Sequence, residues 1–97
     1  MPRRVVFVRR ARRQLNAQLA YVAEHNPAAA QRLRVRIAAA QQQLSDFPRS
    51  APRATSPGTR RLVVAPYILT YRERGTVVEI LDVRHSRQAE RPIPEEG

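Results

Sequence analysis

Between residues 30 and 47, apolar side chains recur at intervals of three and four without exception. They are Ala30, Leu33, Ile37, Ala40, Leu44 and Phe47. Such an a/d seam predicts an amphipathic helix that buries one face, here with Phe47 included in the core. Asn26 and Pro27 precede the seam, and asparagine favours the cap of a helix as proline favours its first position. The second helix should therefore begin directly after Asn26.

A matching stripe precedes Asn26. It consists of Val8, Ala11, Leu15, Leu19 and Val22, and it follows the β-branched and aromatic run VVFV at residues 5–8. The pattern predicts a short buried strand and then a first helix. Because only a short break separates the two helices, they should form an antiparallel hairpin. A coiled-coil dimer is the alternative use of the seam, and the matching stripe favours packing within one chain.

The pattern changes after residue 47. Residues 47–58 hold three prolines and a glycine, which predicts a loop. Beyond them the apolar period falls to two, which predicts strands at 59–65, 67–72 and 76–85 and a hairpin connection at 73–75. The middle strand should carry Tyr67, Leu69 and Tyr71 on one face. The last should be a central strand, with Val77, Leu81 and Val83 on one face and Val78 and Ile80 on the other.

The expected order is strand, helix, helix, strand, strand, strand. It predicts an α+β fold in which a helical hairpin packs on one face of a small, mostly antiparallel sheet and leaves the other face available for a site. The 97 residues suffice for one domain, 1–97. We expect its core within residues 3–86, and a polar, proline-broken tail at 87–97 that is flexible unless a partner orders it.

Composition excludes several classes of site. The chain has no cysteine and only two histidines, far apart in sequence, so disulfides and thiolate metal sites are excluded and a zinc site is improbable. We predict no metal and no cofactor. The VVFV run is too short for a signal-peptide core, and no stretch approaches the roughly 20 apolar residues of a spanning helix. These features predict a cytoplasmic protein.

The formal net charge is +10, and all 18 basic residues are arginine. An acidic partner is expected: nucleic acid, an acidic protein or an anionic membrane surface. Codon bias is an alternative reason for the missing lysine. One arginine cluster should be a solvated helix surface, and it consists of Arg3, Arg4, Arg9, Arg10, Arg12 and Arg13. A second lies in or beside the predicted sheet and is the better candidate for binding; its members are Arg60, Arg61, Arg72, Arg84, Arg87 and Arg91.

Three short motifs follow one another in the second half of the chain. They are Gly58, Arg60 and Leu62, then Tyr67, Leu69 and Tyr71, then Ile80, Val83 and His85. Together with residues 27–49 they resemble the RelE/ParE superfamily of bacterial toxin–antitoxin toxins, over residues 3–88. The resemblance implies a small basic toxin that a co-produced acidic antitoxin wraps, in an oligomeric complex that binds its operator through the antitoxin. RelE-like members cut messenger RNA in the ribosome, whereas ParE-like members poison DNA gyrase and lack the nuclease residues.

RNA cleavage through the 2′-hydroxyl needs a general base and cations against the growing negative charge. His85 is the candidate base, with Arg60, Arg61 and Arg84 as phosphate clamps. The alternative is that His85 closes the strand and hydrogen-bonds locally. RelE-like enzymes typically place a tyrosine or further histidine at or after the last strand, and this chain has neither after His85.

The carboxylates offer no acid–base pair in a regular strand. Glu79 and Asp82 should lie on its opposite faces and form solvated ion pairs with neighbouring arginines. These features predict a ParE-like toxin that inhibits gyrase by binding. A RelE-like ribosome-dependent mRNA endonuclease and a non-toxic nucleic-acid-binding module are the alternatives.

Two residue sets carry this prediction. For target binding we predict Arg72, Arg84, His85, Arg87 and Arg91. For antitoxin binding we predict Arg60, Arg61 and Tyr71.

Overall fold

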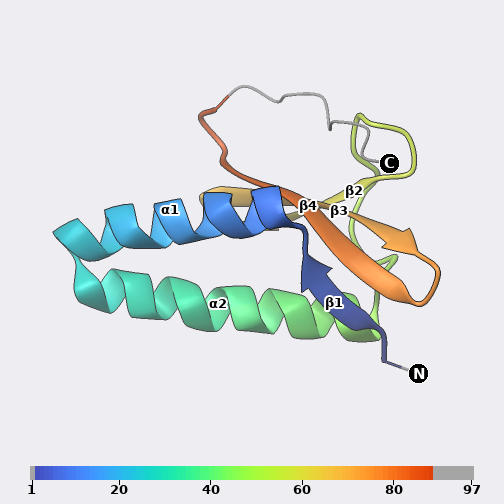
Figure 1. The fold of residues 1–97 in the computed structure, drawn as a ribbon, viewed down its shortest axis with the longest axis horizontal. Helices are drawn as coiled ribbons and strands as arrows, with labels where there is room; N and C mark the ends of the chain where they lie inside the picture. Colours follow the sequence, from blue (N-terminus) through green and yellow to red (C-terminus); the bar gives the residue numbers. More distant parts are fainter. Residues whose placement is uncertain (1, 89–97) are drawn as a thin grey trace.

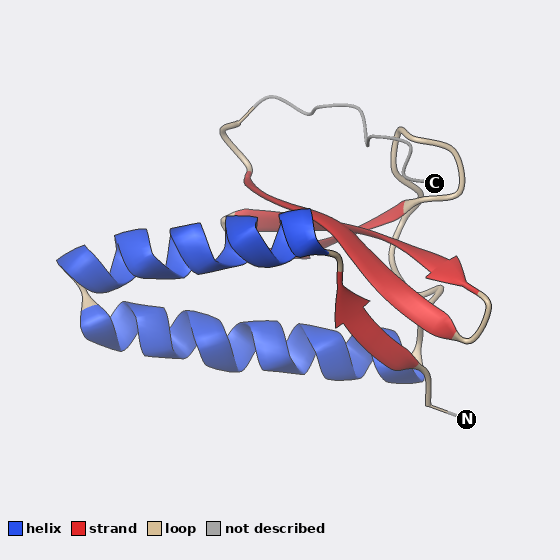
Figure 2. Ribbon diagram, viewed as in Figure 1, coloured by secondary structure: helices blue, strands red, loops and turns tan. Residues whose placement is uncertain are grey.

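Two helices and four strands follow one another in the predicted order (Figure 1). The computed structural model describes residues 2–88. Its elements are β1 (Arg4–Phe7), α1 (Arg9–His25), α2 (Pro27–Asp46), β2 (Arg60–Val64), β3 (Tyr67–Arg74) and β4 (Val77–His85). The helices form a hairpin on one side of the sheet, which confirms the predicted α+β architecture (Figure 2).

The two helices are joined by a single residue, Asn26. Its backbone N–H donates to the carbonyl of Val22 at 2.7 Å and so caps α1. Its side-chain Oδ1 accepts a hydrogen bond from the Ala29 N–H at 3.0 Å and so caps α2, while Pro27 occupies the first turn. One residue thus satisfies backbone groups of both helices, and the cap of α2 is the one that the sequence predicted.

The helical stripes form the core, with one exception. In α2, Ala30, Leu33, Ile37, Ala40 and Leu44 are all buried, and in α1 so are Ala11, Leu15 and Leu19. Most of these residues join one cluster with the sheet, so the seam is covered within the chain. Phe47 was predicted wrongly, because its side chain is 65% exposed. It is the C-cap of α2, at φ −135° and ψ 71°, and the chain has left the helical path that would direct its ring inward.

The sheet has the strand order β1-β4-β3-β2. β1 pairs with β4 in parallel, and the other two pairs are antiparallel. This confirms β4 as a central strand in a mostly antiparallel sheet. Tyr67, Leu69 and Tyr71 are all buried in the core, as predicted. The hairpin connection was placed too early: Glu73 and Arg74 pair with Val78 and Val77, and the turn lies at residues 75–76, where Gly75 takes a φ of +61°.

A β-bulge interrupts β4. Thr70 lies opposite Asp82 while Tyr71 lies opposite Ile80, so Leu81 is an extra residue on β4. Beyond it the alternation of faces changes: Val83 lies opposite Leu69 and joins the same core cluster as Val78 and Ile80. The predicted grouping of Val83 with Val77, against Ile80, was therefore wrong. Periodicity alone does not locate an inserted residue.

Neither helix within residues 2–88 is both long and apolar enough to cross a bilayer. The predicted tail begins at Arg87, and its residues 89–97 lie outside the described part of the chain.

Candidate functional site

The sheet divides the predicted site residues between its two faces. Residues directly opposite each other on paired strands share a face. Arg60 lies opposite Tyr71, and His85 lies opposite Tyr67; both tyrosines are core residues, so Arg60 and His85 lie on the side of the helices. Arg61, Arg72 and Arg84 alternate with these positions and lie on the other side, which we call the outer face. Arg60 and Arg61 thus diverge, as predicted.

The candidate nuclease residues are also separated along the sheet. Tyr67 lies opposite His85, and Tyr71 lies opposite Arg60. These tyrosines are four positions apart on β3, which corresponds to about 13 Å along a strand. The structure therefore brings His85 together with neither Arg60 nor Arg61. Arg84 is its neighbour in sequence and points to the opposite face.

A tight turn closes the end of β4. The Nδ1 atom of His85 accepts a hydrogen bond from the Arg87 N–H at 3.1 Å, and the His85 N–H donates to Oε1 of Gln88 at 2.7 Å. Arg84 Nη1 donates to the Gln88 carbonyl at 2.9 Å. The His85 ring packs edge-on against Tyr67, with 5.5 Å between ring centroids. His85 therefore closes the strand through local hydrogen bonds, which was the alternative reading of this residue.

The other end of the sheet holds a cavity of about 390 Å³ between the 48–60 loop and β2 and β3. Arg49, Arg53 and Arg60 line it with Tyr71 and Glu73. Arg60 Nη1 donates to the Ala51 carbonyl at 2.8 Å. Glu73 accepts hydrogen bonds from Arg49 Nε at 2.9 Å and lies 3.4 Å from Arg3 Nη2. The hydrogen bond from Arg49 is the main cause that lowers the pKa of Glu73.

Tyr71 is inside the core. Its side chain is 0% exposed, and its hydroxyl donates to the Pro48 carbonyl at 2.8 Å. Burial raises the pKa of Tyr71, against the opposing effects of a backbone hydrogen bond with Ala51 and the nearby Arg60 charge. The residue thus fixes the loop after α2, and any effect on a partner would pass through that loop.

The outer face carries two carboxylates that sequence reasoning placed on different faces. Glu79 lies opposite Arg72, and Asp82 lies opposite Thr70, so the bulge brings both to the outer face. Each is bound to a different arginine: Glu79 to Arg72 Nε at 3.0 Å and Asp82 to Arg10 Nη2 at 3.0 Å. The prediction of ion pairs is confirmed. The prediction of solvated pairs was wrong for Asp82, whose side chain is only 8% exposed.

Arg10 was likewise predicted wrongly as a member of a solvated helix surface. Val8 donates its N–H to the Ile80 carbonyl, so α1 starts directly beside β4, where β1 has ended. This places Arg10 and Gln14 next to Asp82. No sequence signal pairs residues 10 and 82, because their proximity depends on the parallel pairing of β1 with β4.

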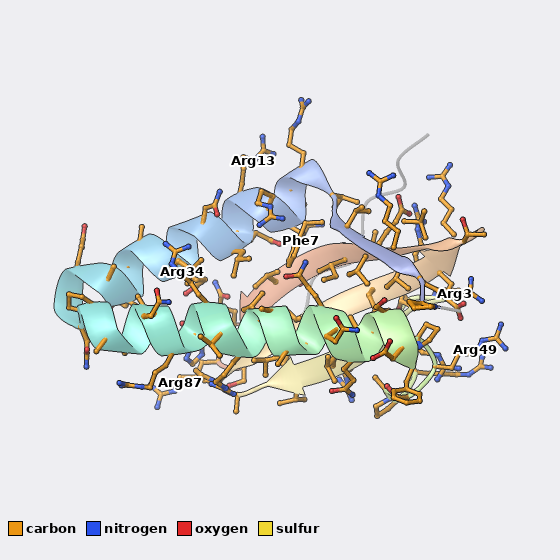
Figure 3. The ribbon with its side chains drawn as sticks, turned by 90° about the horizontal axis from the view of Figure 1, so that it is seen from below. Arg3, Phe7, Arg13, Arg34, Arg49 and Arg87 are labelled. Atoms are coloured by element: carbon orange, nitrogen blue, oxygen red, sulfur yellow. The ribbon has the colours of Figure 1, made fainter. Side chains whose placement is uncertain are left out.

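The helices carry a set of exposed arginines without carboxylate partners in residues 2–88. They are Arg9, Arg12, Arg13, Arg32, Arg34 and Arg36. Arg12 stacks over the Phe7 ring at 4.3 Å. Figure 3 shows Arg13 and Arg34 projecting from the two helices and Arg3 near Arg49 at the end remote from the helix connection. Arg91, predicted to bind the target, lies outside the described residues.

The chain is similar to toxins along nearly its whole length. It is 33% identical to "Toxin RelE2" of Caulobacter vibrioides over 82 residues, which cover 84% of this chain and 93% of that protein. It is 39% identical to "Putative toxin Y4kP" of Sinorhizobium fredii over 88 residues, covering 89% and 91%.

Two solved structures share the fold. The chromosomal ParDE toxin–antitoxin system from P. aeruginosa superimposes with a TM-score of 0.74 at 22% identity, covering 86% of this chain and 95% of the other. The toxin–antitoxin complex RelBE2 from Mycobacterium tuberculosis gives a TM-score of 0.62 at 28% identity, covering 88% and 99%.

A family model described as "ParE toxin of type II toxin-antitoxin system, parDE" matches residues 5–90. This segment includes both helices, all of the strands except the first residue of β1, and all three motifs of the second half. The superfamily expected from those motifs is confirmed. The chain belongs to the ParE toxin family of type II toxin–antitoxin systems, within the RelE/ParE superfamily.

Proposed function

We propose that this toxin is ParE-like and inhibits growth by binding and poisoning DNA gyrase, and that a cognate acidic antitoxin neutralises it. The observation that carries the proposal is the division of the candidate nuclease residues: His85 and Arg60 lie on the helix side, Arg61 and Arg84 on the outer face. A general base must lie within about 3 Å of the proton it removes, with the cations beside the same phosphate. The observed arrangement does not provide this.

The hydrogen bonds of the carboxylates and of the His85 imidazole also support the proposal of a toxin that acts by binding. His85 Nδ1 is used within its own turn, and both outer-face carboxylates are bound to arginines. The outer face presents guanidinium groups near the end of β4, and such groups suit binding to an acidic surface. We therefore place target contact at Arg84, His85 and Arg87, extended by Arg72 and Arg91. Arg72 should contribute less, because Glu79 already neutralises it.

The antitoxin proposal is supported by the two solved structures, which are described as a toxin–antitoxin system and a toxin–antitoxin complex. We propose that an acidic antitoxin folds along this chain with its carboxylates on Arg60, Arg61 and the unpaired arginines of the helices, in an oligomeric complex that binds its operator through the antitoxin. Disordered acidic segments commonly fold on such basic surfaces.

The alternative is a RelE-like ribosome-dependent endonuclease with His85 as base and Arg60, Arg61 and Arg84 as phosphate clamps. It is favoured by the 33% identity to a protein named "Toxin RelE2". It requires the ribosome to supply groups that this chain does not gather around His85.

One experiment separates the two functions. The wild-type chain, His85→Asn and Arg84→Gln/Arg87→Gln are induced in cells, and gyrase supercoiling and message cleavage are measured with the purified proteins. We expect supercoiling to be inhibited by the wild type and, somewhat more weakly, by His85→Asn, which loses one proposed contact and keeps a hydrogen-bond acceptor near the Arg87 N–H. The double arginine variant should inhibit at least tenfold less, since each lost charged contact costs about 1.5–3 kcal/mol.

Arg32→Gln/Arg36→Gln is the matched control, because it removes the same charge from the exposed surface of α2. It should inhibit gyrase like the wild type. Message cleavage that disappears with His85→Asn would instead establish the endonuclease, and harmless expression of the wild type would contradict both functions.

A further inference from the structure

A second cavity lies between α1 and the end of β4. Its volume is about 470 Å³. Gln14, Ala17, Gln18 and Arg10 line it from the helix, and Asp82, Val83, Arg84 and Gln88 line it from the strand and the following turn. The cavity lies beside β4 beyond the end of its pairing with β1, and neither the nuclease prediction nor the antitoxin prediction uses its helical wall.

A fixed hydrogen-bond network holds the wall of this cavity. Asp82 Oδ1 accepts hydrogen bonds from Arg10 Nη2 and from Gln14 Nε2, both at 3.0 Å. The Gln14 Oε1 atom accepts a further one from the Val83 N–H at 2.8 Å. Gln14 therefore ties its helix to both a side chain and the backbone of β4, and the Arg10 guanidinium is held in one orientation.

One atom of this network has no partner. Arg10 Nη1 is the buried side-chain nitrogen that lacks a hydrogen bond, among the polar atoms of residues 2–88. A buried guanidinium N–H without an acceptor is costly, and native proteins rarely leave one unsatisfied. Arg10 lines the cavity, although Nη1 itself is covered, so an acceptor from outside the chain reaches it once a neighbouring side chain moves.

The charges of the walls indicate which acceptor fits. Arg10 and Arg84 are positive, and Asp82 cancels one of the two charges. The net charge of one favours a ligand with a single negative charge, and a doubly charged phosphate would lie beside the Asp82 carboxylate at a cost. The Gln18 amide, which makes no hydrogen bond within residues 2–88, adds a neutral donor to the wall.

We propose that this cavity is a binding site for a carboxylate group. One carboxylate oxygen accepts from Arg10 Nη1, and the other accepts from Arg84 or from the Gln18 amide, after the Gln18 side chain rotates to admit the group. A free small acid and a glutamate or aspartate side chain of a bound protein present the same group. The inference does not depend on whether the toxin acts on gyrase or on the ribosome.

Acetate is the first probe. Arginine Nε–Hε and glutamine side-chain signals of the full-length chain are followed by ¹H–¹⁵N NMR as acetate replaces chloride at constant ionic strength. We expect saturable shifts at Arg10 and Gln18, with phosphate binding more weakly than acetate. A second titration uses glutamate capped at both ends: tighter binding than acetate identifies a side chain of a protein as the natural ligand, and equal binding identifies a free acid.

Two variants with matched controls complete the test. Arg10→Lys keeps the charge beside Asp82 and loses the second terminal nitrogen, so acetate affinity should fall about tenfold. Arg13→Lys, an exposed change one turn along α1, should leave it unchanged. Ala17→Leu fills the cavity from an exposed position and should abolish binding, whereas Ala20→Leu should not.

Absence of saturable shifts, tighter binding of phosphate than of acetate, or equal losses in Arg10→Lys and Arg13→Lys would each overturn the proposal. A retained acetate affinity in folded Ala17→Leu would overturn the assignment to this cavity.

Discussion

The helical hairpin and the sheet of this toxin are held together over very different distances along the chain. In the hairpin, Asn26 alone joins and caps both helices, and every helical hydrogen bond is local. In the sheet, residues 4–7 pair with residues 77–80, and a bulge near Leu81 changes which side chains face the core. The comparison teaches that short-range rules decide the hairpin, whereas pairing between remote segments decides the sheet.

The two regions also differ in how their charges are used. The carboxylates of β3 and β4, Glu73, Glu79 and Asp82, each bind at least one arginine. The exposed arginines of the helices have no such partner within residues 2–88. Arg4, Arg60, Arg61, Arg74 and Arg84 of the strands also lack one there, so the hairpin presents a second basic surface to an acidic partner, besides the sheet on which the binding prediction was based.

The largest expected effect tests the bulge. Val83→Thr places a hydroxyl at a position that is 2% exposed in the core, and we expect it to lower the free energy of unfolding by about 2 kcal/mol. Val77→Thr is the matched control, because Val77 lies opposite Arg74 on the outer face, and it should cost less than about 0.5 kcal/mol. Urea unfolding measures both. Equal costs would mean that β4 alternates regularly and that the bulge is absent.

An intermediate effect tests the local character of the hairpin. Asn26→Ala removes the oxygen that accepts from the Ala29 N–H, and we expect a loss of about 1 kcal/mol in the free energy of unfolding. Asn26→Asp keeps an acceptor at the same position and should stay within about 0.5 kcal/mol of the wild type. Thermal and urea unfolding would both serve. A loss as large with Asp as with Ala would show that the cap contributes nothing.

The smallest effect concerns the ion cluster at the sheet end. The pKa of Glu73 is lowered from 4.5, so the unfolded chain takes up this proton first as the pH falls. The contribution of the cluster is therefore complete above about pH 4.5 and is lost as the pH falls below that value towards the folded pKa. Because Arg49 is largely exposed, solvent screens the ion pair and we expect the smallest of the three effects. The difference in the free energy of unfolding between wild type and Glu73→Gln, measured by urea unfolding at pH 7 and pH 3.5, should be slightly smaller at pH 3.5; an increase would reverse the assigned sign.

Most of the fold could be predicted from the sequence, for reasons that particular residues show. Asn26-Pro27 marks the helix boundary because capping depends on neighbouring residues only. The stripe from Ala30 to Leu44 fixes the buried face of α2, because helical geometry repeats. Phe47 continues the apolar spacing of the stripe, but its ring does not lie on the buried face, because the helix ends one residue earlier.

The site was less predictable, because it depends on contacts between remote segments. The divergence of Arg60 and Arg61 follows from strand alternation and was predicted. The bulge moved Asp82 to the face of Glu79 and towards Arg10, and no pattern in the sequence marks it. The local hydrogen bonds of His85 depend on where the turn places Arg87 and Gln88, which strand periodicity does not predict.

The central position of β4 has a consequence for synthesis of the toxin. Without β4, β1 has no neighbouring strand, and β2 with β3 is a lone two-stranded hairpin, which is marginal in water. β4 is the last of the described strands to be synthesised, so it completes the sheet. The turn at His85 and the wall of the cavity at Asp82 form with it. The proposed contacts at Arg84 and His85 therefore take their places only after β4 has paired with β3.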